Sequence, residues 1–502
     1  MRFLHPALFG LLGMGMGMAQ SPLATAYRLK EAPRMGPLVS EVLRFPTVAG
    51  NEKARLDQQA WVLKVGKDLG FSVCEAGKVT EVELSGPTGA PVIGLVVHGD
   101  VQPVDDQWTI PPFAGVVRNG IVLGRGAADD KGPLVQALLA MKVLKDSGRV
   151  RTHTIRLLVG SDEESTNLDF AEYLKDHKAP DFSLVLDSEF PVVVGEKAWN
   201  ALTVETELKD RKHGDLIVGS MQSGLAASIV PDEAVLKLAE NEHWASAQAL
   251  SLAQRWKQHA FDPGISLSSK TGTGPDALTV TIHGKAAHAG VNAQGGRNAL
   301  VALASLLVDE LPEGGAKDLL AFAKLAGQDL KGTGLGLATA DPVFGFPTVV
   351  PSLLKVQENG KVRLTINIRT TPTLSGEALK AHLFKQVADF NARTGAHLEP
   401  GGFFGDTPLA FDPQGKLVKR LIASYAKATG KAEAPAISGG GTYAKRIPNA
   451  IAFGMWFPGK PYPGHDVDEQ VPLEDLHKGV EVLLEALSDL ACGAPLREPL
   501  KP

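Results

Sequence analysis

Three predicted strands of this chain each end in residues that can bind a metal or move a proton, and this feature restricts the fold most. An apolar run at 94–97 leads into His98-Gly99-Asp100, a run at 154–159 leads into the acidic segment 162–164, and a run at 182–186 leads into Asp187. In an open α/β sheet, ligands bind beyond the carboxyl ends of the strands. We therefore expect these distant side chains to meet at one edge of a sheet.

A predicted helix over residues 131–145 adds an acidic pair to this edge. Leu134, Leu138 and Met141 recur at near-helical spacing, and Asp129-Asp130 directly precede the helix. Taken singly, such acidic pairs are most often solvated or complement the dipole of a helix N-terminus. Their position next to predicted strand ends and a histidine instead favours a shared metal site.

Composition restricts the choice of partner and of metal ligands. With 502 residues the chain is long enough for two or more domains. Its 51 basic and 56 acidic residues give a net charge of -5, and no run of five basic residues occurs, so a nucleic-acid partner is not expected. Cys74 and Cys492 form no CxxC pair, and any metal must therefore use histidine and carboxylate ligands, which suit Zn²⁺ or Mn²⁺.

The N-terminus has the pattern of an export signal. Met1-Arg2 precede an uncharged, largely apolar stretch that ends in small residues at Gly17 and Ala19. We expect residues 1–19 to be a signal peptide, with a periplasmic or secreted mature protein that is not stably inserted in a membrane. An uncleaved anchor and an unstructured N-terminus are the alternatives.

The pattern along the chain predicts an α/β fold with an inserted domain. Helical and strand patterns alternate up to about residue 197, whereas alternating segments such as 202–208 and 362–368 dominate the next part. We expect a mixed, mostly parallel sheet flanked by helices over residues 26–197 and 399–495. It is interrupted by an α+β domain over residues 198–398.

Several segments, in the same order along the chain, resemble a known family. They are His98-Gly99-Asp100-Val101-Gln102-Pro103, Trp108 with Pro112-Phe113, residues 124–133 around Asp129-Asp130, Asp162-Glu163-Glu164, Leu186-Asp187-Ser188-Glu189-Phe190-Pro191, Gly439-Gly440-Gly441-Thr442-Tyr443 and Gly464-His465. The chain resembles the co-catalytic zinc metallopeptidases that include carnosinases, aminoacylases and bacterial dipeptidases. It is most similar to the dipeptidase V (PepV-like) and Xaa-His dipeptidase group, over about residues 39–487.

This resemblance implies two divalent cations per chain, with zinc preferred and manganese or cobalt as alternatives. Five side chains are implied as ligands: Asp129 between the two ions, His98 and Asp187 at one ion, and Glu164 and His465 at the other. Glu163 is implied as the general base. Asp100, two residues after His98, can accept the ring N–H that faces away from a metal.

The inserted domain is implied to be a lid that contributes to substrate binding. Ala286-Ala287-His288-Ala289-Gly290 matches the segment whose histidine stabilises the oxyanion, and Arg369, at the end of Thr365-Ile366-Asn367-Ile368-Arg369, matches the arginine that holds the substrate carboxylate. A packed histidine and a surface ion pair are the alternatives for these two residues. In the glycine-rich motif, Gly440 and Thr442 are expected to contact the substrate.

The expected function is hydrolysis of dipeptides or very short peptides by an exported metallopeptidase, through a metal-bridging hydroxide activated by Glu163. The partner is then a small peptide, and the protein a monomer or homodimer. An N-acyl amino-acid deacylase or a carboxypeptidase with the same machinery is the first alternative. An inactive peptide-binding protein is the alternative from another class.

Overall fold

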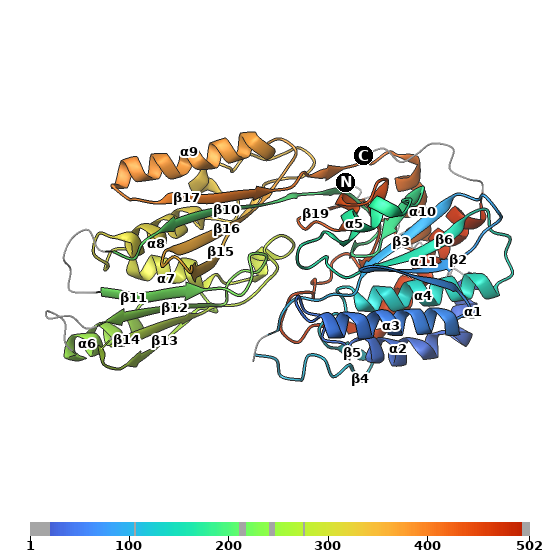
Figure 1. Cartoon of the computed structure of the whole chain (residues 1–502), viewed down its shortest axis with the longest axis horizontal. Helices are drawn as coiled ribbons and strands as arrows, with labels where there is room; N and C mark the ends of the chain where they lie inside the picture. Colours follow the sequence, from blue (N-terminus) through green and yellow to red (C-terminus); the bar gives the residue numbers. More distant parts are fainter. Residues whose placement is uncertain (1–20, 105–106, 210–216, 240–245, 275–276, 494–502) are drawn as a thin grey trace, which may run out of the picture.

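Two large sheets, each with its own hydrophobic core, lie along the long axis of the molecule (Figure 1). This computed structural model describes residues 21–104, 107–209, 217–239, 246–274 and 277–493. The predicted signal peptide at residues 1–19 lies outside these ranges. We call the first sheet with its helices the first unit, and the second sheet with its helices the second unit.

The sheet of the first unit is mixed. Its described strands are β1 (Ser72–Ala76), β2 (Val79–Leu84), β3 (Val92–His98), β6 (Thr154–Gly160), β7 (Phe182–Val185), β9 (Val193–Glu196), β18 (Leu409–Ala410), β19 (Ala436–Ser438) and β20 (Ala450–Ala452). The central strands β6, β3, β7 and β20 are parallel neighbours. Antiparallel strands extend the sheet on both sides of them. The carboxyl ends of the central strands therefore lie at one edge.

Strand alternation in this sheet produces two buried faces. In β3, Ile93, Leu95 and Val97 belong to the large core of the first unit, whereas Val96 belongs to a smaller core on the opposite face. Helices cover both faces: α1 (Pro22–Lys30), α2 (Met35–Val42), α3 (Glu52–Asp68), α4 (Lys131–Asp146), α5 (Asp169–Asp176), α10 (Lys416–Thr429) and α11 (Leu473–Cys492). Since α4 contacts β3, α2 and α11, it is buried on nearly all sides.

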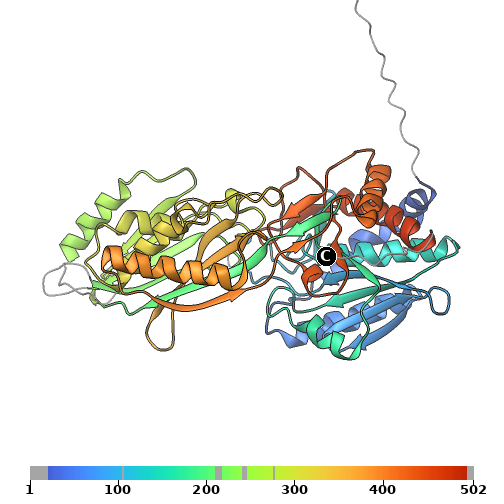
Figure 2. The same cartoon turned by 90° about the horizontal axis from the view of Figure 1, so that it is seen from above.

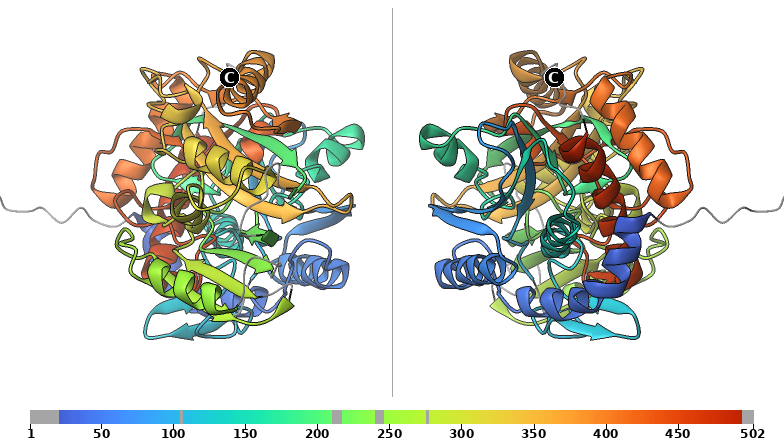
Figure 3. Two further views of the ribbon diagram at one scale, coloured as in Figure 1. Left: turned by 90° about the vertical axis from the view of Figure 1, so that its left-hand side faces the viewer. Right: turned by 90° about the vertical axis from the view of Figure 1, so that its right-hand side faces the viewer.

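The sheet of the second unit is antiparallel and carries its helices as a layer, as Figures 1 and 2 show. Its described strands are β10 (Ala198–Thr206), β11 (Ile217–Ser223), β12 (Glu233–Ala239), β13 (Ser266–Thr271), β14 (Leu278–His283), β15 (Thr348–Val356), β16 (Val362–Thr370) and β17 (Glu399–Gly405). Its helices are α6 (Ser246–Lys257), α7 (Ala299–Leu307), α8 (Gly315–Ala326) and α9 (Gly376–Thr394). Figure 3 views the molecule from its two ends, with the second unit nearest the viewer in the left panel and the first unit nearest in the right panel.

The predicted fold class, a mixed α/β sheet with an inserted α+β region, is confirmed. The chain enters the second sheet at β10 and leaves it after β17, which pairs with β10. Residues 399–405 therefore belong to the second sheet, although the sequence pattern placed them in the first domain. Their sequence, Glu-Pro-Gly-Gly-Phe-Phe-Gly, lacks the apolar alternation that would have indicated a strand of the second sheet.

Two small sheets support the loops around the site. One joins β4 (Val116–Arg118), β5 (Ile121–Leu123) and β22 (Gln470–Pro472), and the other joins β8 (Ser188–Glu189) and β21 (Met455–Trp456). Among the described residues, no helix is both long enough and apolar enough to span a membrane.

Candidate metal centre and active site

The three strand ends singled out in the sequence converge at one edge of the first sheet. His98 is the last residue of β3, residues 162–164 follow β6, and Asp187 follows β7. These strands are adjacent in the order β6-β3-β7 and run parallel. Asp129 and Asp130 reach the same edge because they immediately precede α4, which contacts β3.

Two clusters of ligand-type side chains share Asp129. The first cluster is His98, Asp129 and Asp187, the second cluster is Asp129, Glu164 and His465, and the ligand atoms in each lie within 4.8 Å of one another. In the first, His98 Nε2 lies 2.9 Å from Asp129 Oδ1 and 3.8 Å from Asp187 Oδ2. In the second, His465 Nε2 lies 3.0 Å from Glu164 Oε1 and 3.2 Å from Asp129 Oδ2. The two oxygens of Asp129 thus face different histidines.

The His465 loop is shaped to bring its histidine close to Asp129. His465 has a left-handed backbone with φ of 66°. The preceding Gly464 packs so closely that an added Cβ would lie 2.9 Å from Asp129 Oδ2 and closer still to Tyr462 Oη. A glycine is therefore required there, which agrees with the Gly-His motif in the sequence.

The charges at this site fit divalent cations. Burial raises the pKa of Asp187, and the neighbouring carboxylates of Asp130 and Asp129 raise it further. Burial likewise raises the pKa of Glu163, and the neighbouring Glu164 carboxylate raises this pKa further. Buried carboxylates that disfavour one another's ionisation are stabilised by a cation between them. Histidine and carboxylate ligands without cysteine suit Zn²⁺ or Mn²⁺, so the side chains present fit the two ions that the sequence predicts.

The His98 ring is held by the main chain, which differs from the prediction for Asp100. His98 Nδ1 lies 2.9 Å from the carbonyl oxygen of Asp100, whereas the nearest carboxylate oxygen of Asp100 is 3.6 Å away. The carboxylate instead accepts hydrogen bonds from the main-chain N–H groups of Glu163 (3.2 Å) and Glu164 (2.9 Å). Asp100 therefore links the His98 strand end to the acidic loop, and burial raises its pKa to about 7.

His288 reaches this site from the second unit. Its ring centroid lies 4.6 Å from that of His465. Its Nδ1 accepts hydrogen bonds from the N–H groups of Gly290 (3.0 Å) and Val291 (2.9 Å), so Nδ1 carries no proton and Nε2 carries it. Burial lowers the pKa of His288, and nearby His465 and Arg369 lower it further, which keeps the ring neutral with Nε2–H as a donor.

Arg369 lies on the face of the second sheet opposite its core. In β16, Leu364, Ile366 and Ile368 pack into that core, and alternation turns Arg369 the other way, across from Trp199 on β10. Arg369 is 5% exposed, and its guanidinium carbon lies 5.9 Å from the centre of the Trp199 ring. Burial lowers its pKa to about 10.

The polar contacts of Arg369 leave the outer part of its guanidinium available. Within the described chain its side chain makes one hydrogen bond, from Nε to Asn367 Oδ1 at 3.1 Å. Both terminal amino groups therefore remain free to bind a planar anion.

The glycine-rich loop brings the two units together beside His288. A Cβ on Gly290 would lie 2.6 Å from the carbonyl oxygen of Gly439 and 3.0 Å from Arg369 Nε. A Cβ on Gly440 would lie 3.8 Å from His288 Cε1. The Thr442 hydroxyl donates to Glu196 Oε1 at 2.7 Å and accepts from the N–H of Ala444, so it anchors this loop. Its predicted contact with substrate stays a prediction.

Three further residues contact the clusters and were not identified from the sequence. The Tyr462 hydroxyl donates to Asp129 Oδ2, and Gln102 Nε2 donates to Glu164 Oε2 at 2.7 Å. Glu469 accepts hydrogen bonds from the loop that carries Asp129. Each lies within or next to a quoted motif, but no spacing rule distinguishes it from a solvated polar residue.

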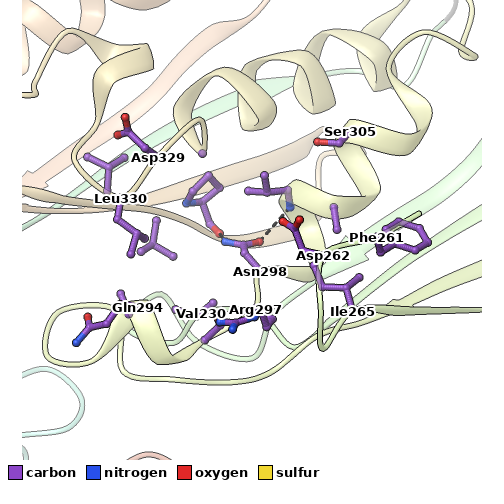
Figure 4. Close-up of a pocket in the computed structure, with 18 of the residues that line it drawn as sticks. Val230, Phe261, Asp262, Ile265, Gln294, Arg297, Asn298, Ser305, Asp329 and Leu330 are labelled. Atoms are coloured by element: carbon purple, nitrogen blue, oxygen red, sulfur yellow. Dashed lines mark hydrogen bonds between the residues drawn. The ribbon is translucent and has the colours of Figure 1, made fainter. Parts of the chain in front are cut away.

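The described pockets differ in their relation to these clusters. A pocket of about 430 Å³ lies within the second unit (Figure 4). In it, Asn298 donates a hydrogen bond to the carbonyl oxygen of Pro351 and accepts one from the N–H of Val301, and Asp262 and Arg297 line the same pocket. None of the cluster residues lines it. A smaller pocket of about 220 Å³ adjoins the site, since Tyr462 and Gly439 are among its lining residues.

Comparisons with known proteins agree with this geometry. "Putative dipeptidase YtjP" of Bacillus subtilis is 30% identical over 438 residues, 86% of this chain and 89% of that protein. Beta-Ala-Xaa dipeptidase of Lactobacillus delbrueckii subsp. lactis is 28% identical over 410 residues, 79% of this chain and 82% of that protein. The crystal structure of human carnosine dipeptidase 1 is similar in fold, with a TM-score of 0.58 at 12% identity over 93% of this chain and 98% of that one.

The family assignment follows from the extent of the sequence match. The pattern of Peptidase family M20/M25/M40 matches residues 94–489, which include every residue of both clusters. Its members are metal-dependent enzymes with a dinuclear centre. This chain therefore belongs to Peptidase family M20/M25/M40 and is a metallopeptidase.

Proposed function

We propose that this protein is an exported, dinuclear metal-dependent dipeptidase. The observation that carries the proposal is the position of two ligand clusters sharing Asp129 next to a neutral His288 and a buried Arg369 with free donors. The dipeptidase names of its relatives support the choice of substrate.

In this proposal His98, Asp129 and Asp187 hold one cation, and Asp129, Glu164 and His465 hold the other. Zinc is the proposed metal, with manganese or cobalt as alternatives. When bound, the cations supply Lewis-acid polarisation of the scissile carbonyl and lower the pKa of water. Without the shared Asp129 carboxylate, the repulsion between two adjacent cations would be poorly screened.

Glu163 is the proposed general base. It accepts a proton from the attacking water and then donates that proton to the nitrogen of the leaving amine. Burial raises the pKa of Glu163, and the Glu164 carboxylate raises it further, which is the direction expected of a carboxylate that must also release its proton as an acid. Asp100 orients this base by accepting the main-chain N–H of Glu163 at 3.2 Å.

His288 and Arg369 are proposed to recognise the substrate from the second unit. With two main-chain N–H groups on Nδ1, His288 presents Nε2–H to the carbonyl oxygen as negative charge develops on it. Arg369 binds the carboxylate of the residue after the scissile bond through its free terminal amino groups. Gly440 and Thr442 line the same region from the first unit. Because Arg369 lies at a fixed position relative to the scissile bond, only a peptide that ends one residue after that bond places its carboxylate on the guanidinium. This requirement selects short peptides.

The decisive experiment combines metal analysis with a substrate panel. The purified protein should contain two divalent ions per chain and hydrolyse free dipeptides faster than N-acyl amino acids or C-terminally extended peptides. Preferred hydrolysis of N-acyl amino acids would instead identify a deacylase. Absence of hydrolysis with two bound ions would identify a peptide-binding protein.

A further inference from the structure

A buried carboxylate outside the two clusters holds the segment that carries Asp129. Glu469 is 1% exposed and lies four residues after His465. Its Oε1 accepts hydrogen bonds from the N–H groups of Ala128 (2.8 Å) and Asp129 (3.2 Å), and its Oε2 accepts one from the N–H of Gly126 (3.0 Å). A single side chain therefore satisfies three donors of the 126–129 segment.

A guanidinium completes this arrangement. Arg125 Nη1 donates to Glu469 Oε2 at 3.0 Å, and the guanidinium carbon lies 5.1 Å from the centre of the Trp108 ring. Glu469 thus receives four hydrogen bonds, two at each oxygen, which fills the acceptor capacity of a carboxylate. A glutamine at position 469 has the same shape, but its N–H₂ group would face the two donors at one of these oxygens. The two hydrogen bonds at that oxygen would then be lost.

Glu469 connects the two chain segments that carry Asp129 and His465, both members of the second cluster. Asp129 and Glu469 are 340 positions apart in sequence, and Glu469 follows His465 on the same loop. Asp129 has one oxygen 2.9 Å from His98 Nε2 and the other 3.2 Å from His465 Nε2. A small tilt of the 126–129 segment would bring one oxygen closer to its histidine and move the other away.

We propose that Glu469 is a positioning residue that sets the orientation of the Asp129 carboxylate between the two metal sites. The inference rests on the proposed function, because it assumes that both clusters bind cations. Partners that orient metal ligands typically change metal affinity by 10- to 100-fold when they are lost. Glu469 does this through the main chain of the Asp129 segment and touches no substrate.

The test measures Zn²⁺ affinity by chelator competition on the full-length protein, together with the unfolding temperature of the metal-free form. Glu469→Gln should weaken binding of at least one ion by 10- to 100-fold. Glu469→Asp keeps the charge but shortens the side chain, and should give a smaller loss. The matched control is Asp318→Asn in the second unit, where a buried carboxylate accepts the N–H of His397 at 3.0 Å. It should lower the unfolding temperature without changing Zn²⁺ affinity.

The outcomes separate this inference from the proposed function. If the unmodified protein binds fewer than two ions, the metal assignment itself fails. If it binds two, and Glu469→Gln binds both with unchanged affinity, the positioning role is refuted. An equal loss of affinity in Asp318→Asn would also refute it, because the effect would then follow general destabilisation. Should Glu469→Gln fail to fold, unchanged affinity in Glu469→Asp would refute the proposal.

Discussion

Replacing Arg369 by alanine tests why short peptides with a free carboxylate should be preferred. Arg369 is 5% exposed, its Nε donates a hydrogen bond to Asn367, and its terminal amino groups have no hydrogen-bond partner among the described residues. A substrate carboxylate bound there forms a desolvated charge pair. Removing one member of such a pair typically costs about 2–5 kcal/mol. At about 3 kcal/mol, kcat/KM for a free dipeptide should fall by over a hundredfold.

The assay compares a free Gly-X dipeptide, its C-terminal amide and a tripeptide. With the unmodified enzyme the amide leaves the buried guanidinium unpaired and should already be a poor substrate. Arg369→Ala should therefore lower kcat/KM strongly for the free dipeptide and only slightly for the amide. The ratio of the two kcat/KM values should become smaller. Arg363→Ala is the matched control, because Arg363 lies on the same strand but pairs with Glu205 at 2.5 Å. It should leave both rates nearly unchanged.

The carboxylate-binding role would be refuted by an Arg369 variant that loses activity equally on free and amidated substrates. That result would indicate that Arg369 supports the local packing around Trp199 and Gly290, beside which it lies. The preference for short free peptides would then need another physical cause.

Four further predictions concern the remaining parts of the site and the N-terminus. Glu163→Gln should keep both metal ions but lower kcat by several orders of magnitude, because an amide cannot relay the proton; near-normal turnover would exclude Glu163 as base. Asp129→Ala should lose both ions together in elemental analysis, and full retention of one ion would contradict a shared ligand. His288→Ala should lower kcat by 100- to 1000-fold with a smaller change in KM, as expected for an oxyanion donor, and a pure KM effect would argue against this role. N-terminal sequencing of the protein purified from its natural host should begin near residue 20 if the proposed signal peptide is cleaved, whereas an intact Met1 would contradict signal cleavage.

The first unit was predictable because its signals are local. The apolar runs before His98 and Asp187 are short and continuous, as expected of parallel strands buried on both faces, and each contributes side chains to two cores. The convergence of their ends then follows from a general rule for α/β sheets. The acidic pair at 129–130 was placed correctly for the same reason, since helix α4 has a clear apolar repeat.

The orientation of individual side chains was less accessible to sequence reasoning. The His98-x-Asp100 spacing predicted a carboxylate partner for the ring, but the main-chain carbonyl of Asp100 lies 2.9 Å from Nδ1 and the carboxylate 3.6 Å. Both groups belong to the same residue and fit the same spacing. Which one meets the ring depends on the acidic loop after β6, whose N–H groups draw the carboxylate away.

Contacts between the two units were the least accessible, since they depend on how a second sheet meets the first. Alternation along β16 indicates that Arg369 points away from the core of the second unit, but a strand pattern alone cannot distinguish an exposed arginine from one facing another unit. The close approach of Gly290 to Gly439 places the Arg369 face against the first unit. The two backbones could not come so near if either residue carried a side chain. Glycine at 290 and 439 therefore allows the segment with His288 to reach His465 within the same chain. A larger residue at either position should separate the units and reduce catalysis. The two clusters of ligand-type side chains should stay intact, because they lie wholly in the first unit.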